Sequence, residues 1–164
     1  MRTILAGSLV LSLLAFGAPQ VQGQIALGPE ISVAEDVDLG IGAVIEAPLT
    51  TIYEQLEFAG RFTLYFPDGG DYWELNGDVR YLFPLEGENA LLPYALAGIA
   101  LGHSSWDYEG PGEGGSGSDT EIALRIGGGF KVPMDRMTPF AELGLGIGDL
   151  PDFTLRGGLT FPVG

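Results

Sequence analysis

The stretch from Thr120 to Val132 reads TEIALRIGGGFKV. Every second residue from Ile122 onward is apolar or glycine, whereas the positions between them hold the charges of the stretch, Glu121, Arg125 and Lys131. Such alternation predicts a β-strand, because successive strand side chains point to opposite faces. The stretch exceeds the usual strand length of about 5 to 6 residues and reaches the roughly 9 to 11 that a transmembrane strand needs. It therefore predicts a strand with different surroundings on its two faces, long enough to cross a membrane.

The first residues predict export. A basic start at residues 1–3 precedes an apolar run at 4–16 and a small-residue exit at 21–23. This order is typical of a cleaved secretory signal peptide over residues 1–23, and it leaves residues 24–164 as one mature domain. A buried N-terminal helix is the alternative. The apolar run is too short for a membrane-spanning helix, so a membrane protein with this sequence would cross the bilayer as strands.

Composition excludes several classes of function. The chain is 46% hydrophobic, with 27 glycines, no cysteine and a net charge of −15. Without cysteine, an exported domain must be stabilised by packing or by closing a sheet. Removing Arg2 leaves 6 of the 7 basic residues against 22 acidic ones, so a nucleic-acid partner is excluded. The sequence has no phosphate-binding loop, dinucleotide fingerprint or His-Glu-x-x-His pattern, and we predict no cofactor.

Eight segments repeat the alternation, separated by turn-rich breaks. They cover residues 25–33, 37–49, 56–66, 73–85, 91–105, 120–132, 140–148 and 153–161. Eight short-linked strands close most simply as an up-and-down antiparallel barrel. In the fifth segment the odd positions 95 to 101 compete with Tyr94 and Leu96 for the apolar face, and we favour the odd positions. The predicted fold is an all-β, eight-stranded antiparallel transmembrane β-barrel.

The charges decide which face points inward. The polar face carries five of the six mature basic residues and eight carboxylates, and the apolar face carries none: the polar set is Glu30, Asp38, Glu46, Glu57, Arg61, Glu74, Asp78, Arg80, Glu121, Arg125, Lys131, Glu142 and Arg156. Glycines crowd the same face, where they would leave room for long side chains inside a narrow barrel. We therefore expect a charge network in the lumen and an apolar exterior facing lipid. A soluble periplasmic β-sandwich that binds a ligand is the alternative fold.

Two strands carry a family resemblance. PYALAGIALG at 93–102 and the terminal FTLRGGLTF at 153–161, together with the signal peptide and the eight amphipathic segments, resemble the small outer-membrane β-barrels of the OmpA/OmpX class. The chain departs from that class by ending in PVG after Phe161, where family members typically end on an aromatic residue. The resemblance implies a bacterial outer-membrane location with lipid and lipopolysaccharide as surroundings, and we expect a monomer.

Residues 106–119 and the only histidine suggest further roles. The stretch is glycine-rich and acidic, so we expect one long outer loop that binds an extracellular partner. Its Asp107, Glu109, Glu113 and Asp119 could hold a hard cation weakly.

His103 and Ser105 share the predicted outward face. This pair resembles the His-x-Ser pair of outer-membrane lipid A deacylases. However, the asparagine that usually follows the serine in that family is replaced here by Trp106. Glu121 is only a nominal acid as the third member of the catalytic group. A lipid A-modifying enzyme that uses His103 and Ser105 is the alternative function.

The main functional hypothesis is not enzymatic. Buried charges must pair, so the lumen charges predict either a side-chain plug or, alternatively, a gated ion path. We expect a structural or surface-interaction barrel that starts on the periplasmic side near Gln24. Residues 106–119 would then lie outside, and residues 86–89 and 134–137 would form short periplasmic turns.

Overall fold

The structure is a computed structural model that describes residues 24–35, 38–67, 70–85, 91–110 and 113–163. The predicted signal peptide and the predicted turn at 86–89 lie outside these residues. Within them, no helix is long and apolar enough to cross a membrane.

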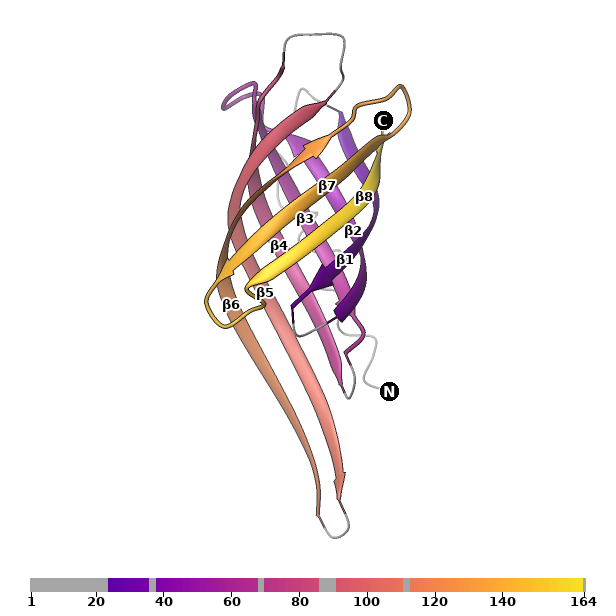
Figure 1. Ribbon diagram of the computed structural model, residues 1–164, viewed down its shortest axis with the longest axis vertical. Coiled ribbons are helices and arrows are strands. Elements are labelled where there is room, and N and C mark those ends of the chain that lie inside the picture. The colour runs from indigo at the N-terminus through magenta and orange to yellow at the C-terminus, as the bar shows by residue number, and fades with distance from the viewer. Residues whose placement is uncertain (1–23, 36–37, 68–69, 86–90, 111–112, 164) are drawn as a thin grey trace.

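Eight antiparallel strands form one closed barrel (Figure 1). Each strand pairs with the next along the chain, and the last pairs with the first: β1 (Ile25–Ala34), β2 (Asp38–Pro48), β3 (Leu56–Tyr65), β4 (Asp71–Leu82), β5 (Leu92–Gly110), β6 (Glu113–Lys131), β7 (Thr138–Ile147) and β8 (Phe153–Val163). The predicted eight-stranded up-and-down barrel is confirmed.

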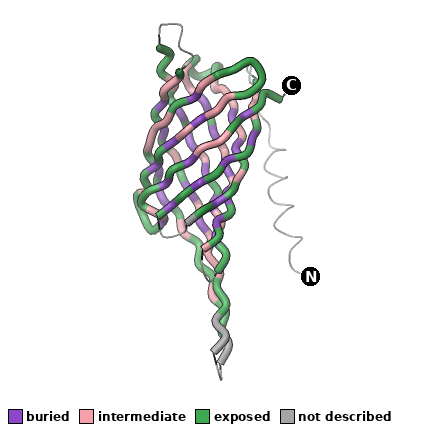
Figure 2. Tube along the Cα trace, turned by 45° about the vertical axis from the view of Figure 1, so that its right-hand side comes forward, coloured by how far each residue is buried: buried purple, intermediate pink, exposed green. Residues whose placement is uncertain are grey.

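Apolar side chains cover the outside of the barrel. Figure 2 shows the alternation of buried and exposed residues along its strands. On β6, Ile122 is 67% exposed and Leu124 58% exposed, whereas Ala123 between them is 2% exposed. On β5 the odd positions face outward, as predicted, and Tyr94 and Leu96 are buried inside. An apolar exterior around a polar interior is the pattern of a barrel surrounded by lipid. The alternative of a soluble β-sandwich is therefore wrong.

The predicted loop at 106–119 is wrong as well, because this segment is a β-hairpin. β5 and β6 stay paired beyond the barrel, from Trp106 opposite Gly117 to Gly110 opposite Glu113, and they project from one end of it (Figure 1). Backbone hydrogen bonds hold the hairpin, and both its faces lie outside the barrel wall, so its sequence needs no apolar alternation. A Cβ at Gly117 would lie 2.7 Å from the Trp106 ring, so this ring covers the glycine.

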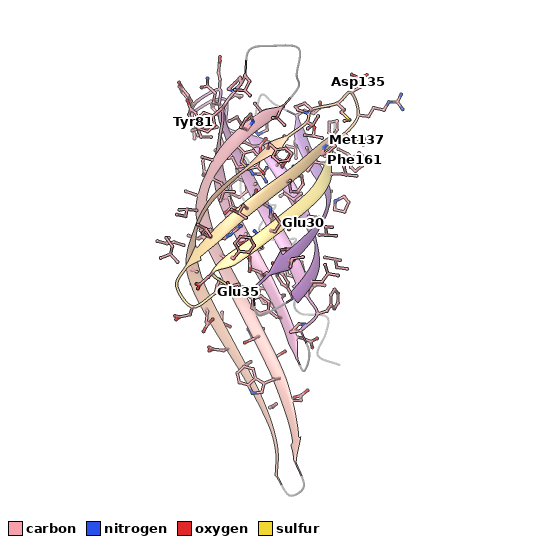
Figure 3. All side chains as sticks on the ribbon, in the orientation of Figure 1. Glu30, Glu35, Tyr81, Asp135, Met137 and Phe161 are labelled. Atoms are coloured by element: carbon pink, nitrogen blue, oxygen red, sulfur yellow. The ribbon has the colours of Figure 1, made fainter. Side chains whose placement is uncertain are left out.

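The two ends of the barrel differ. The hairpin end has the connections at 35–37, 66–70, 111–112 and 148–152, and the terminal end has both ends of the barrel chain and the connections at 49–55, 83–91 and 132–137. Glu35 lies at the hairpin end and Asp135 at the terminal end (Figure 3). The longest projection, the hairpin, lies at the end of the barrel opposite Ile25 and Val163, as expected. The short turn expected at 134–137 is present, because the Met134 N–H donates to the Met137 carbonyl at 3.0 Å, whereas the turn expected at 86–89 lies outside the described residues.

Candidate functional site

The barrel interior brings most of the predicted lumen residues together. Eleven of the thirteen are buried at inward positions: Glu30, Glu46, Glu57, Arg61, Glu74, Asp78, Arg80, Arg125, Lys131, Glu142 and Arg156. Glu121 is half-buried on β6 and takes no part in the ion pairs among the described residues. The side chain of Asp38 lies outside the described part of the chain.

Glu142 on β7 occupies the centre of the lumen. Its Oε2 accepts hydrogen bonds from Arg61 Nη2 at 2.5 Å, Arg80 Nη2 at 3.0 Å and the Tyr94 hydroxyl at 3.0 Å. Its Oε1 lies 3.6 Å from Arg125 Nη2 and 4.0 Å from Arg156 Nη1. One carboxylate thus faces four guanidinium groups from β3, β4, β6 and β8, and it links strands on different sides of the barrel.

The arginines around Glu142 have further carboxylate partners. Arg61 pairs with Asp78 and donates from Nε to Glu30 at 3.1 Å. Arg125 Nη1 donates to Asp78 Oδ2 at 2.9 Å. Arg156 Nη2 donates to Glu74 at 2.6 Å. Each of these bonds has a charged donor and a charged acceptor, which makes it stronger than a bond between neutral groups.

A second cluster lies toward the terminal end. Lys131 Nζ donates to both oxygens of Glu57, at 2.7 and 2.8 Å, and lies 2.9 Å from Glu46 Oε2. Arg80 pairs with both carboxylates and connects this cluster to Glu142. The Arg80 guanidinium also lies over the Tyr94 ring, 4.6 Å from its centroid. Arg80 therefore joins the two parts of the network.

The network is nearly balanced in charge. Five buried basic side chains face six buried carboxylates, and each of these eleven residues makes at least one ion pair. Removing one partner of a buried pair typically costs about 3 to 5 kcal/mol, because the other charge stays buried without compensation. The arrangement can hold the barrel wall together, because its ion pairs join side chains of different strands.

Neutral residues that sequence reasoning did not assign to the site complete it. Asn76 Nδ2 donates to Glu74 at 2.7 Å, and Thr160 Oγ1 donates to Glu46 at 3.0 Å. Tyr94 bonds to Glu142, as described above. All three occupy inward positions of the alternation, so the period itself was the signal that could have identified them.

The structure separates Glu121 from His103, the two outer members of the alternative catalytic group. His103 Nδ1 is hydrogen-bonded to Thr120 Oγ1 at 2.8 Å, and its ring lies 5.3 Å from the Trp73 ring. Glu121 pairs with Gly102, an inward position, so it lies on the opposite face of the sheet from His103. Glu121 therefore cannot serve as the acid of a His103–Ser105 pair. Its nominal role as the third member of that group is wrong.

No group of three or more potential metal ligands occurs within the described residues. The side chains of Glu109 and Glu113 lie outside them, and Asp107 and Asp119 are exposed on the hairpin. Weak cation binding at 106–119 stays a prediction.

The fold and the charged interior define a class, the eight-stranded transmembrane β-barrel. No protein-family model and no curated protein sequence matches this chain. Among solved structures it is similar to the N-terminal β-barrel domain of Pseudomonas aeruginosa OprF, with a TM-score of 0.65 and 18% identity over 87% of this chain and 98% of that one.

Two further solved structures are similar to this chain. Neisserial surface protein A has a TM-score of 0.56 and 17% identity, over 85% of this chain and 95% of its own. Ail, the attachment invasion locus protein of Yersinia pestis, has a TM-score of 0.52 and 19% identity, over 85% of this chain and 97% of its own. At these identities the similarity shows the fold, which is that of the small outer-membrane barrels predicted from the sequence.

Proposed function

We propose that the mature chain, residues 24–164 after removal of the signal peptide 1–23, is a monomeric bacterial outer-membrane barrel. It serves a structural or surface-interaction role, has no enzymatic activity and has a lumen closed by side chains. The observation that carries this proposal is the ion-pair network around Glu142 inside a wall whose exterior is apolar. Four arginines converge on this one carboxylate, which leaves little space for an open channel in an eight-stranded barrel.

The hairpin of β5 and β6 is where we place the contact with an extracellular partner. It extends beyond the barrel, and its Trp106 and Asp107 are exposed. Ail of Yersinia pestis has been crystallised with the heparin analogue sucrose octasulfate, which is polyanionic. Here, however, five of the six basic residues of the mature chain lie in the lumen. The sixth, Arg136, lies at the terminal end. The hairpin end would repel a polyanion, and a neutral or basic partner fits it better.

The same charge distribution limits the contacts that the barrel can make with lipopolysaccharide. With no lysine or arginine at the hairpin end, contact with lipopolysaccharide would come from its acyl chains against the apolar exterior. Its phosphate groups would find no cationic partner there. An enzyme acting on lipid A is disfavoured, because His103 is bonded to Thr120 and the nominal acid lies on the other face of the sheet.

Reconstitution of the purified mature chain into planar lipid bilayers tests the closed lumen. We expect a heat-modifiable band on electrophoresis, which reports a folded barrel, and no steady ion conductance. Glu142→Gln keeps the shape of the side chain and removes its charge, and it serves as a comparison for any residual current. A stable open conductance from the folded wild-type barrel would contradict the proposal, as would recovery of the mature chain as a soluble periplasmic protein.

A further inference from the structure

The interior at the hairpin end differs from the charged centre. There the buried side chains form an apolar and aromatic layer made of Ala34, Tyr65, Tyr72, Ala100, Ala123 and Leu150. The Tyr65 and Tyr72 rings lie 5.3 Å apart. We call this group of six residues the apolar layer. It separates the ion pairs from the solvent at this mouth of the barrel.

Leu150 is the one member of the apolar layer that does not belong to a strand. It comes from the connection 148–152 between β7 and β8, and yet it is 7% exposed. The base of this connection is held by a hydrogen bond from the Gly146 N–H to the Asp152 carbonyl at 2.9 Å. The connection therefore turns back into the mouth instead of extending into the solvent.

Two glycines allow this inward turn. Gly148 has a φ of +142°, which side chains rarely permit. On the facing strand β5, a Cβ at Gly102 would lie 2.4 Å from Leu150 Cδ2, so only glycine leaves space for the leucine. The sequence of two separate elements is thus matched to the insertion of one side chain.

The polar network begins directly behind the apolar layer. The Tyr72 hydroxyl donates to Glu74 at 3.3 Å, and Glu74 accepts from Arg156 at 2.6 Å. The Tyr65 hydroxyl is hydrogen-bonded to Ser32 at 2.9 Å. Each tyrosine therefore contributes its ring to the apolar layer and its hydroxyl to polar partners, which places the boundary between the two environments at these residues.

At the terminal end the ion-pair network keeps slight contact with solvent. The side chains of Glu57 and Lys131 are 11% and 5% exposed, whereas those of Arg61 and Arg156 in the centre are fully buried. The most exposed member of the ion-pair network, Glu57, therefore lies on the terminal side, whereas on the hairpin side the apolar layer lies over Glu74, which is 3% exposed.

We infer that Leu150 is a plug that closes the hairpin-end mouth, so that water and ions reach the ion-pair network from the terminal end only. Apolar constrictions exclude ions because an ion would lose its hydration without gaining a partner. The connection 148–152 lies outside the strand ladder, so Leu150 can leave the mouth without breaking strand pairing. This inference rests on the proposed closed lumen and assigns the seal at one mouth to a single side chain.

Cysteine accessibility tests the plug, because the chain has no cysteine of its own. Ala100→Cys places a thiol in the apolar layer, and Leu96→Cys places one at a buried inward position toward the terminal end. The folded barrel in lipid vesicles is treated with a small charged thiol reagent, with Leu150 intact or replaced by Ala. Leu150→Met is the matched control, because methionine fills a similar volume.

With Leu150 intact, and equally in the Leu150→Met control, the thiol of Ala100→Cys should react slowly. With Leu150→Ala it should react at least about tenfold faster, the factor equivalent to about 1.4 kcal/mol in the opening equilibrium. The thiol of Leu96→Cys should keep the same rate in all three backgrounds. Heat-modifiable migration confirms that each variant is folded, and Ala123→Cys replaces Ala100→Cys if the latter does not fold.

Fast reaction of the Ala100→Cys thiol with Leu150 intact would overturn the inference, because the mouth would then be open. Slow reaction in every background would also overturn it, because another group would form the seal. Failure of the proposed function is measured separately: a wild-type barrel that conducts in planar bilayers contradicts the closed lumen, whereas the thiol rates report on this mouth alone.

Discussion

Strands β5 and β6 each pass through two environments, the barrel wall and the hairpin beyond it. The two regions differ in side-chain pattern, although the strands are paired in both. Within the barrel they alternate between lipid-facing apolar residues and lumen residues. In the hairpin, from Trp106 and Gly117 outward, the same two strands stay paired although their residues are mostly glycine, serine and acids. Pairing thus depends on the backbone, whereas the alternation of side chains reports the surroundings of the two faces.

Removal of the central carboxylate should have the largest effect. Glu142→Ala leaves Arg61 and Arg80 without one partner each, and we expect the free energy of unfolding to fall by about 3 to 5 kcal/mol. Denaturant titration in lipid vesicles measures it. The hairpin control is Asp107→Ala, where an exposed carboxylate is removed and the change should stay within about 0.5 kcal/mol. Equal losses would show that the lumen charges contribute no more than exposed ones.

A charge on the lipid-facing side should cost somewhat less. Leu124→Arg is expected to lower the free energy of unfolding by about 2 to 4 kcal/mol if position 124 lies near the bilayer midplane. Ala123→Ser, on the lumen side, should cost much less. Ser116→Arg, on the hairpin, should leave stability nearly unchanged. Similar tolerance at positions 123 and 124 would show that the inward and outward faces are assigned incorrectly.

Loss of the ring over Gly117 should act on the hairpin alone. Trp106→Ala removes a cross-strand contact of a kind that contributes about 0.2 to 1 kcal/mol. Amide hydrogen exchange in detergent micelles should become faster for residues 115–119 and stay unchanged for the β6 amides within the barrel. Faster exchange throughout β6 would mean that the two regions open as one cooperative unit.

The smallest effect on stability should come from cutting the hairpin. A protease site inserted between Gly114 and Gly117 should be cleaved in intact cells, and the barrel should keep its heat-modifiable migration, because the hairpin adds little packing. Cleavage that requires a permeabilised outer membrane would place the hairpin in the periplasm. It would then contradict the surface-interaction part of the proposed function.

The comparison also explains which parts of the structure the sequence predicts. Segments such as Thr120–Val132 were predicted correctly because a lipid face and a lumen face impose alternation. The strands of the hairpin are not predicted from the sequence, because neither face of the hairpin requires apolar residues. Its glycines and serines are instead typical of a loop. Leu150 was missed for a related reason, since an inserted residue in a connection has no periodic neighbours that indicate burial.

The sequence predicts which residues belong to the candidate site but not the contacts between them. Alternation places Arg61, Arg80 and Glu142 at inward positions, but it does not say which of them meet. That depends on the stagger of β3, β4 and β7 around the barrel, which arises only when the sheet closes. The central position of Glu142 is therefore a property of the closed barrel and of no single segment.

The pairing of β1 with β8 has a consequence for assembly kinetics. Leu27 lies opposite Phe161, so the contact that closes the barrel joins residues from the two extremes of the mature chain. Such a high contact order slows folding, because the entropy of closing so long a loop is lost before the contact forms. Until β8 arrives, β1 keeps an unpaired edge and the apolar exterior stays exposed, so a nascent chain is prone to aggregate. Substitutions in β8 should therefore reduce the yield of assembled barrel more than they reduce the stability of barrels already closed.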